Sequence, residues 1–200
     1  MADAIICQEG IEHFSDQLEA LKEFNKVLKK EGELILTTPN YSNLGARLSY
    51  LLMESEKYNK LMPPNEIDSI WMNANDKVDE IYYGHIFLLG IQKLRVLSVL
   101  SGFRIKEIIY TRKKVGSLFL LPFCYPLIYF SSLYTYKKNM RKNTNSNIAL
   151  KRNTYKEQFK LATDVGLLLD SHLFIVFEKI SEIYEVSQSL KSVHKGFETT

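Results

Sequence analysis

The 200-residue sequence has few cysteines, little net charge and no closely spaced glycines. Its two cysteines, Cys7 and Cys124, have the wrong number and spacing for a disulfide framework or a zinc knuckle, so we expect a reducing, cytoplasmic compartment. The net charge of +3 is too small to indicate nucleic-acid binding, and we expect no nucleic-acid partner. The first ten residues, MADAIICQEG, lack the basic segment of a secretory signal.

The nine glycines are scattered along the chain. No two of them are close enough to form the G-x-G turn in which bare backbone approaches a bound nucleotide. A glycine-rich cofactor loop is therefore excluded within these residues.

The sequence does contain enough apolar material for one globular domain with a core, since 46% of its residues are hydrophobic and 12% are aromatic. Residues 4–7 are continuously apolar and predict a short, fully buried strand. Asp16 and Glu19 resemble a capping box that begins a helix, for which Lys29, Lys30 and Gly32 predict the last turn and the end. Its expected apolar stripe is Leu18, Leu21, Phe24, Val27 and Leu28.

Residues 33–38 predict a second strand, and the short connections predict that it runs parallel to the first. Further along, the pattern predicts a helix over 44–53 and then a polar loop with Pro63, Pro64 and Trp71. It predicts a helix over 92–101, with Leu94, Leu97, Val99 and Leu100 inward, and a strand over 103–110. A helix over 161–169 and a last strand over 172–177 are expected to follow.

Four segments together resemble a known family: DAIICQEGIEHF, LKEFNKVLKKEGELILTTPN, LSGFRIKEIIY and SHLFIVFEK. In this order they are similar to the second half of class I S-adenosylmethionine-dependent methyltransferases, in the branch of ubiquinone-type and sugar O-methyltransferases. The resemblance implies an α/β, Rossmann-like sheet with local strand order four, five, seven, six, the seventh strand antiparallel. It also implies that the N-terminal strands are missing and that an apolar insertion precedes the last strand.

The resemblance divides the chain into four parts. Residues 1–114 are expected to form the C-terminal half of the methyltransferase core, 115–152 an apolar and basic insertion, 153–179 the end of the core and 180–200 a tail. The family's glycine-rich cofactor loop and ribose-binding carboxylate belong to strands that precede residue 1, so we expect the chain to be a fragment.

The implied function is methyl transfer from S-adenosylmethionine to an oxygen or nitrogen nucleophile of a small molecule, a sugar or a lipid-linked glycan. By position, Cys7, Gln8 and Glu9 would lie against the methionine and adenosine parts of the cofactor, at the strand ends where open parallel sheets bind ligands. The alternative is that these three residues only end a strand. For the whole chain, the rivals are a non-catalytic remnant or interaction module and a peripheral membrane protein.

The stretch from Glu9 to His13 contains the strongest candidate site. Glu9, Glu12 and His13 offer two carboxylates and an imidazole, which suit a divalent ion such as Mg²⁺ or Zn²⁺. In the family resembled, some members with this pattern use a further histidine, and His85 stands at the matching place. The metal would hold a substrate hydroxyl and lower its pKa. Without metal, His13 or His85 is the candidate general base, and the remaining alternative is a solvated acidic turn.

A 22-residue uncharged stretch, residues 115–136, is followed by six basic residues and no acidic residue through Arg152. Its length admits a membrane span, but its prolines, serines and tyrosines argue against one. A cap over the site, a dimer surface and peripheral contact with a membrane through 115–152 remain as alternatives. Residues 39–41 are expected to face the substrate or to form a plain turn. His172 is expected to be structural, and His194 to lie in the tail.

Overall fold

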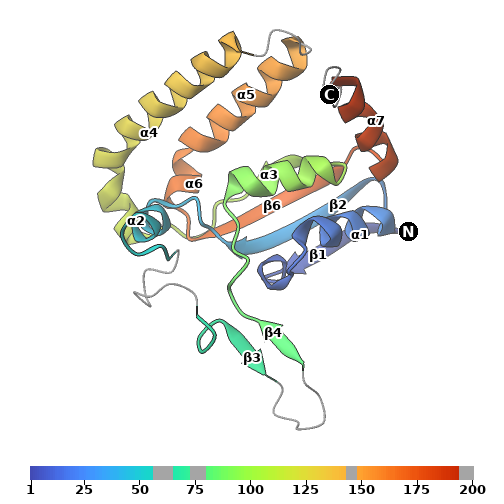
Figure 1. Ribbon diagram of the computed structural model, residues 1–200, viewed down its shortest axis with the longest axis horizontal. Helices are drawn as coiled ribbons and strands as arrows, with labels where there is room; N and C mark the ends of the chain where they lie inside the picture. Colours follow the sequence, from blue (N-terminus) through green and yellow to red (C-terminus); the bar gives the residue numbers. More distant parts are fainter. Residues whose placement is uncertain (56–64, 73–79, 143–147, 194–200) are drawn as a thin grey trace, which may run out of the picture.

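A computed structural model describes residues 1–55, 65–72, 80–142 and 148–193 (Figure 1). Pro63, Pro64 and His194 lie outside the described residues. The elements are β1 (Ala2–Gln8), the 3-10 turn η1 (Ile11–His13), α1 (Gln17–Val27), β2 (Leu28–Pro39), α2 (Leu44–Met53), β3 (Ile70–Met72), β4 (Ile81–Tyr83), α3 (Ile91–Leu100), β5 (Phe103–Ile108), α4 (Val115–Arg141), α5 (Ile148–Thr163), α6 (Val165–Leu169), β6 (His172–Lys179) and α7 (Ile183–Val193).

The main sheet has the strand order β1-β2-β6-β5. β1 and β2 are parallel, as the short strand–helix–strand connections predict, whereas β6 runs antiparallel to both of its neighbours. Gln8 pairs with Thr37 and Pro39 pairs with His172. The carboxyl ends of β1 and β2 and the start of β6 therefore meet at one edge of the sheet.

The prediction of a fully buried first strand is wrong. β1 is an edge strand in which Cys7 is the one buried residue, and Ile6 is 70% exposed. Its outer edge pairs with no strand in the part of the chain that the structure describes. A continuous apolar run predicts burial on both faces, but here the core forms on the face that carries Cys7, Leu36 and Ile175, which lie opposite one another.

Helix α1 begins as predicted and ends earlier than predicted. The Asp16 side chain accepts a hydrogen bond from the Glu19 backbone N–H, which satisfies one of the free donors at the start of the helix. The helix stops at Val27 because Leu28, which is fully buried, is already extended and starts β2. Lys29, Lys30 and Gly32 are therefore strand residues, and Val27, expected inward, is 52% exposed.

Helices α2 and α3 lie where the sequence predicts them, although Val99 in α3 is 40% exposed rather than inward. Helices α1, α3 and α7 contact one another, and the core fills the space between them and the sheet. One buried cation stabilises this layer: the Lys179 Nζ donates to the carbonyl oxygens of Asn25 and Leu28 and pairs with Glu182 at 2.8 Å. β3, which contains Trp71, pairs with β4 in a small separate sheet.

Residues 115–141 form one continuous helix, α4, in spite of Pro122 and Pro126. Helices α4 and α5 pack against each other and lie beside the end of the sheet (Figure 1). The helix expected over 161–169 is divided, because Asp164 ends α5 and caps α6 by accepting a hydrogen bond from Leu167 N–H. α4 is long and apolar enough to cross a membrane, with a mean hydropathy of 1.5 over its most apolar window.

Candidate functional site

The candidate site begins where β1 ends at the carboxyl edge of the sheet. Glu9 has a left-handed backbone conformation, with φ of 47°, and its N–H donates to the Thr37 carbonyl oxygen at 3.0 Å. The chain therefore turns sharply beside the end of β2 and enters η1, which carries Glu12 and His13. A strained turn for a non-glycine residue holds these two side chains at the strand end.

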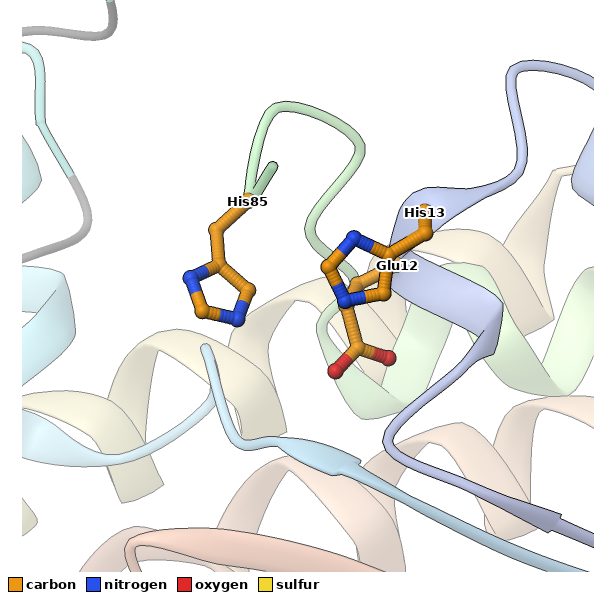
Figure 2. A group of neighbouring side chains, drawn as sticks. All are labelled: Glu12, His13 and His85. Carbon is orange, nitrogen blue, oxygen red and sulfur yellow. The ribbon is translucent and has the colours of Figure 1, made fainter. Parts of the chain in front are cut away.

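Glu12, His13 and His85 form a cluster in which one ligand atom from each lies within 4.8 Å of the others. Figure 2 shows Glu12 and His13 projecting from the same short turn, while His85 reaches the same space from a separate loop. His85 follows β4 in the chain, far from η1 in sequence. Its position beside the other two therefore depends on the tertiary fold and not on local capping.

Glu12 is the buried member of the cluster, with no exposed surface. Its Oε2 accepts a hydrogen bond from the Thr38 hydroxyl at 2.9 Å, whereas its Oε1 is buried with no hydrogen-bond partner among the described residues. Burial raises the pKa of the Glu12 carboxyl above its ordinary value, and hydrogen bonds from its own backbone and from Thr38 offset part of that rise. A buried acceptor without a partner is rare and costly, so it marks a functional candidate.

His13 is oriented by a backbone carbonyl. Its Nδ1 lies 2.6 Å from the carbonyl oxygen of Tyr83, and because a carbonyl oxygen only accepts, Nδ1 carries the proton. The neutral ring then has its lone pair on Nε2. This is the arrangement in which a protein usually presents histidine to a metal or to an acidic proton. The His85 and Trp71 rings lie 5.3 and 6.0 Å from the His13 ring.

Glu9 is not part of this cluster. Its side chain is 39% exposed, and its Oε2 lies 3.9 Å from the Nε2 of His172 at the start of β6. Glu9 and His172 therefore form a second polar pair on the same edge of the sheet. No local pattern predicts His172 at this position, because its placement depends on β6 running antiparallel to β2.

Of the other two predicted cofactor contacts, Gln8 is exposed at the strand tip and Cys7 is buried in the core. Burial raises the pKa of the Cys7 thiol, and the Glu12 carboxylate raises it further. Cys7 is thus a packing residue beside the cluster rather than a reactive thiol.

The side chain of Asn40, which directly follows β2, forms hydrogen bonds with other parts of the protein. Its amide donates to the carbonyl oxygens of Leu167 and Asp170, and its side-chain oxygen accepts from Ser42 N–H. These bonds fix the start of the loop that leads to α2. Residues 39–41 were expected either to face the substrate or to form a plain turn, and the hydrogen bonds of Asn40 match the turn.

The cluster has the residue types that could hold a metal ion. Two ligands of one zinc ion, each about 2.1 Å from the metal, lie at most about 4.2 Å apart. The ligand atoms lie within 4.8 Å of one another, which is slightly larger, so one imidazole would have to rotate for all three residues to bind one ion. The Oε1 of Glu12, which has no hydrogen-bond partner among the described residues, and the tautomer fixed at His13 both suit such an ion. Two imidazoles and one carboxylate favour Zn²⁺ or a similar ion over Mg²⁺, which prefers oxygen ligands.

The N-terminal part of the chain matches a known family. Residues 1–36 match the model of the methyltransferase domain family. The match spans β1, η1, α1 and most of β2, and so includes Glu9, Glu12 and His13. No curated protein matches the chain.

Several solved structures match the chain, and one of them aligns with most of it. It is described as a candidate sarcosine dimethylglycine methyltransferase from Galdieria sulphuraria, has 14% sequence identity and a TM-score of 0.35, and covers 88% of this chain and 52% of its own. The chain therefore spans about half the length of that protein.

Proposed function

We propose that the chain is the C-terminal half of a class I methyltransferase that moves a methyl group from S-adenosylmethionine to an oxygen or nitrogen atom. The observation that carries the proposal is the match of residues 1–36 to the methyltransferase domain. The sheet order β1-β2-β6-β5, with an antiparallel strand inserted third, supports it because this is the order expected of strands four, five, seven and six.

Cofactor binding would take place at the carboxyl edge of the sheet, where ligands of open α/β sheets bind. Gln8 and Glu9 lie at that edge and are accessible. Cys7, also expected to contact the cofactor, is buried behind them and would act by packing. S-adenosylmethionine carries no phosphate, so the protein would bind it through its ribose and methionine groups. These 200 residues supply few such contacts, because they contain no glycine-rich loop.

The acceptor would be bound beside Glu12, His13 and His85. With a divalent ion, these three residues are the proposed ligands, and the ion would lower the pKa of a bound acceptor hydroxyl. The protein itself contributes the orientation of the ligands: the Tyr83 carbonyl holds His13, and Thr38 holds Glu12. Glu9, which the sequence also predicts as a metal ligand, lies outside this cluster, and its Oε2 is 3.9 Å from the Nε2 of His172.

Without metal, His13 is the better candidate for a general base. Its Nδ1–H donates to the Tyr83 carbonyl, so Nε2 is free to take a proton from an acceptor hydroxyl. The buried Glu12 would then stabilise the imidazolium that forms. Both versions use proximity of the nucleophile and the methyl group as the main source of rate.

The test is production of S-adenosylhomocysteine, which reports methyl transfer to any acceptor. The longest form of the protein that its gene encodes is incubated with S-adenosylmethionine and with extracts of small molecules and of lipid-linked glycans. Formation of S-adenosylhomocysteine that depends on one extract supports the proposal and identifies the acceptor class. No product from any extract, with the protein folded, favours the non-catalytic interaction module.

A further inference from the structure

The outward face of α4 carries an apolar stripe, defined here by residues spaced three or four positions apart. The members of the apolar stripe are between 66% and 77% exposed, and they are Val115, Phe119, Phe123, Leu127, Phe130 and Tyr134. Residues at this spacing share one face of a helix. Scattered apolar residues on a surface are ordinary, but a continuous row along a 27-residue helix marks an interaction surface.

The opposite face of α4 is fixed to the rest of the protein, so the direction of the apolar stripe is defined. At the start of the helix, Ser117 is fully buried and its hydroxyl accepts a hydrogen bond from Gly45 N–H at 3.2 Å. Further along, the rings of Tyr129 and Tyr136 contact the ring of Phe159 in α5, with centroids 5.6 and 5.9 Å apart. The apolar stripe therefore faces away from α5 and the core.

In its second half, α4 partly buries two polar side chains while it exposes two aromatic ones. Ser132 and Asn139 are partly buried and, together with the exposed Thr135, line a pocket of about 380 Å³ between α4 and α5. Phe130 and Tyr134 face outward. A surface helix in water turns its polar residues outward and its apolar residues toward the protein. The outward arrangement fits an apolar environment outside the protein.

Charge identifies the chemistry of that environment. Residues 108–156 contain no aspartate or glutamate and ten basic residues: Arg112, Lys113, Lys114, Lys137, Lys138, Arg141, Lys142, Lys151, Arg152 and Lys156. Basic residues therefore stand at both ends of the apolar stripe. Two copies of α4 packed through the stripe would oppose basic ends whether they ran parallel or antiparallel. A negatively charged lipid surface is complementary to both ends.

We propose that α4 docks on an anionic membrane, lying along its surface with the apolar stripe in the boundary between headgroups and acyl chains. An interfacial helix has this combination of an aromatic and aliphatic face with flanking lysine and arginine. A helix of 27 residues is about 40 Å long, so the flanking charges would contact headgroups well apart from each other. Crossing the membrane instead needs about 20 residues, and a span over residues 115–134 would place the Ser131 and Ser132 hydroxyls in hydrocarbon, which is unfavourable. The inference does not depend on methyl transfer.

The experiment is flotation of the full 200-residue chain with vesicles of phosphatidylcholine, with and without phosphatidylserine. We expect binding to the anionic vesicles to be at least about tenfold tighter, and to weaken at high salt. Phe119→Ser combined with Phe123→Ser should weaken binding by a further factor of about ten or more, because these residues are 74% and 77% exposed and contribute insertion without charge.

The matched control is Ile180→Ser with Tyr184→Ser, which removes exposed apolar side chains near α7, at the opposite end of the molecule from α4 (Figure 1). It should bind vesicles like the unchanged chain. Circular dichroism confirms that each variant is folded. Equal binding to neutral and anionic vesicles overturns the proposal. Normal vesicle binding by the variant with Phe119→Ser and Phe123→Ser also overturns it. Dimer formation through the apolar stripe without lipid binding overturns it as well. Release of the chain from vesicles only by detergent would indicate a membrane span and would also overturn the proposal.

Discussion

Replacing Glu12 with glutamine is expected to make the protein more stable at neutral pH while removing its candidate function. In the folded protein the Glu12 carboxylate is fully buried, and its Oε1 has no hydrogen-bond partner among the described residues. An uncompensated buried polar group costs about 1–3 kcal/mol, and more when charged. Glutamine has nearly the same shape, keeps an oxygen to accept from the Thr38 hydroxyl, and removes the charge. We therefore expect Glu12→Gln to raise the free energy of unfolding at pH 8 by about 1 kcal/mol.

The pH dependence of stability also gives the direction in which Glu12→Gln should change the free energy of unfolding. The folded-state pKa of Glu12 is raised above its ordinary value of 4.5, so the folded protein holds a proton that the unfolded chain has lost. Stability contributed by this group is present below pH 4.5 and is lost as pH rises through the raised pKa. The Glu12→Gln variant has no such group, so the decline should be smaller. Urea unfolding at a series of pH values, followed by circular dichroism, measures the difference.

Zinc should reverse the order of stability if the cluster binds metal. A ligand at a hundred times its dissociation constant stabilises the folded state by about 2.7 kcal/mol, which the unchanged chain should gain and Glu12→Gln should largely lack. The matched control is Glu9→Gln, at a 39% exposed position on the same edge, which should change stability by no more than about 0.5 kcal/mol. Glu12→Gln that is destabilised by 1 kcal/mol or more at pH 8 would refute the reasoning.

Two further predictions concern the chain by itself. Without a glycine-rich loop, the 200-residue chain should bind S-adenosylmethionine weakly or not at all in isothermal titration, and a micromolar dissociation constant would show that the strand ends present here suffice. Because β1 has one paired edge among the described residues and Ile6 is 70% exposed, the isolated chain should self-associate, and Ile6→Lys should reduce this. Light scattering measures it, and a monomer at high concentration would contradict the expectation.

Local signals in the sequence predicted the elements that depend on local chemistry. The Asp16–Glu19 pair predicts the start of α1 because a side-chain cap acts within one turn. The end of α1 was predicted wrongly, since lysines and a glycine also suit the first residues of β2, and burial of Leu28 decides between them. The exposure of β1 was missed because an apolar run does not show which strands lie beside it.

In the candidate site, too, local sequence predicts some positions and the tertiary fold decides the others. Glu12 and His13 are adjacent in sequence, so their shared position follows from the chain itself. The partners that orient them were not predictable, because the Tyr83 carbonyl belongs to β4 and the Thr38 hydroxyl to the end of β2. His85 was proposed from resemblance alone, and its approach to His13 depends on how the loop after β4 folds. The pairing of Glu9 with His172 follows only from the antiparallel register of β6.

The most direct measurement compares methyl transfer by His85→Ala and His172→Ala variants of the longest form that the gene encodes, through S-adenosylhomocysteine formation at saturating cofactor. His85 lies in the cluster with Glu12 and His13, whereas His172 lies beside Glu9 outside it. We predict that His85→Ala loses at least about a hundredfold in rate, as expected for a general base or metal ligand, while its unfolding midpoint stays close to that of the unchanged protein. His172→Ala should lose much less. Equal rates for His85→Ala and the unchanged protein would contradict the assignment of Glu12, His13 and His85 as the catalytic site.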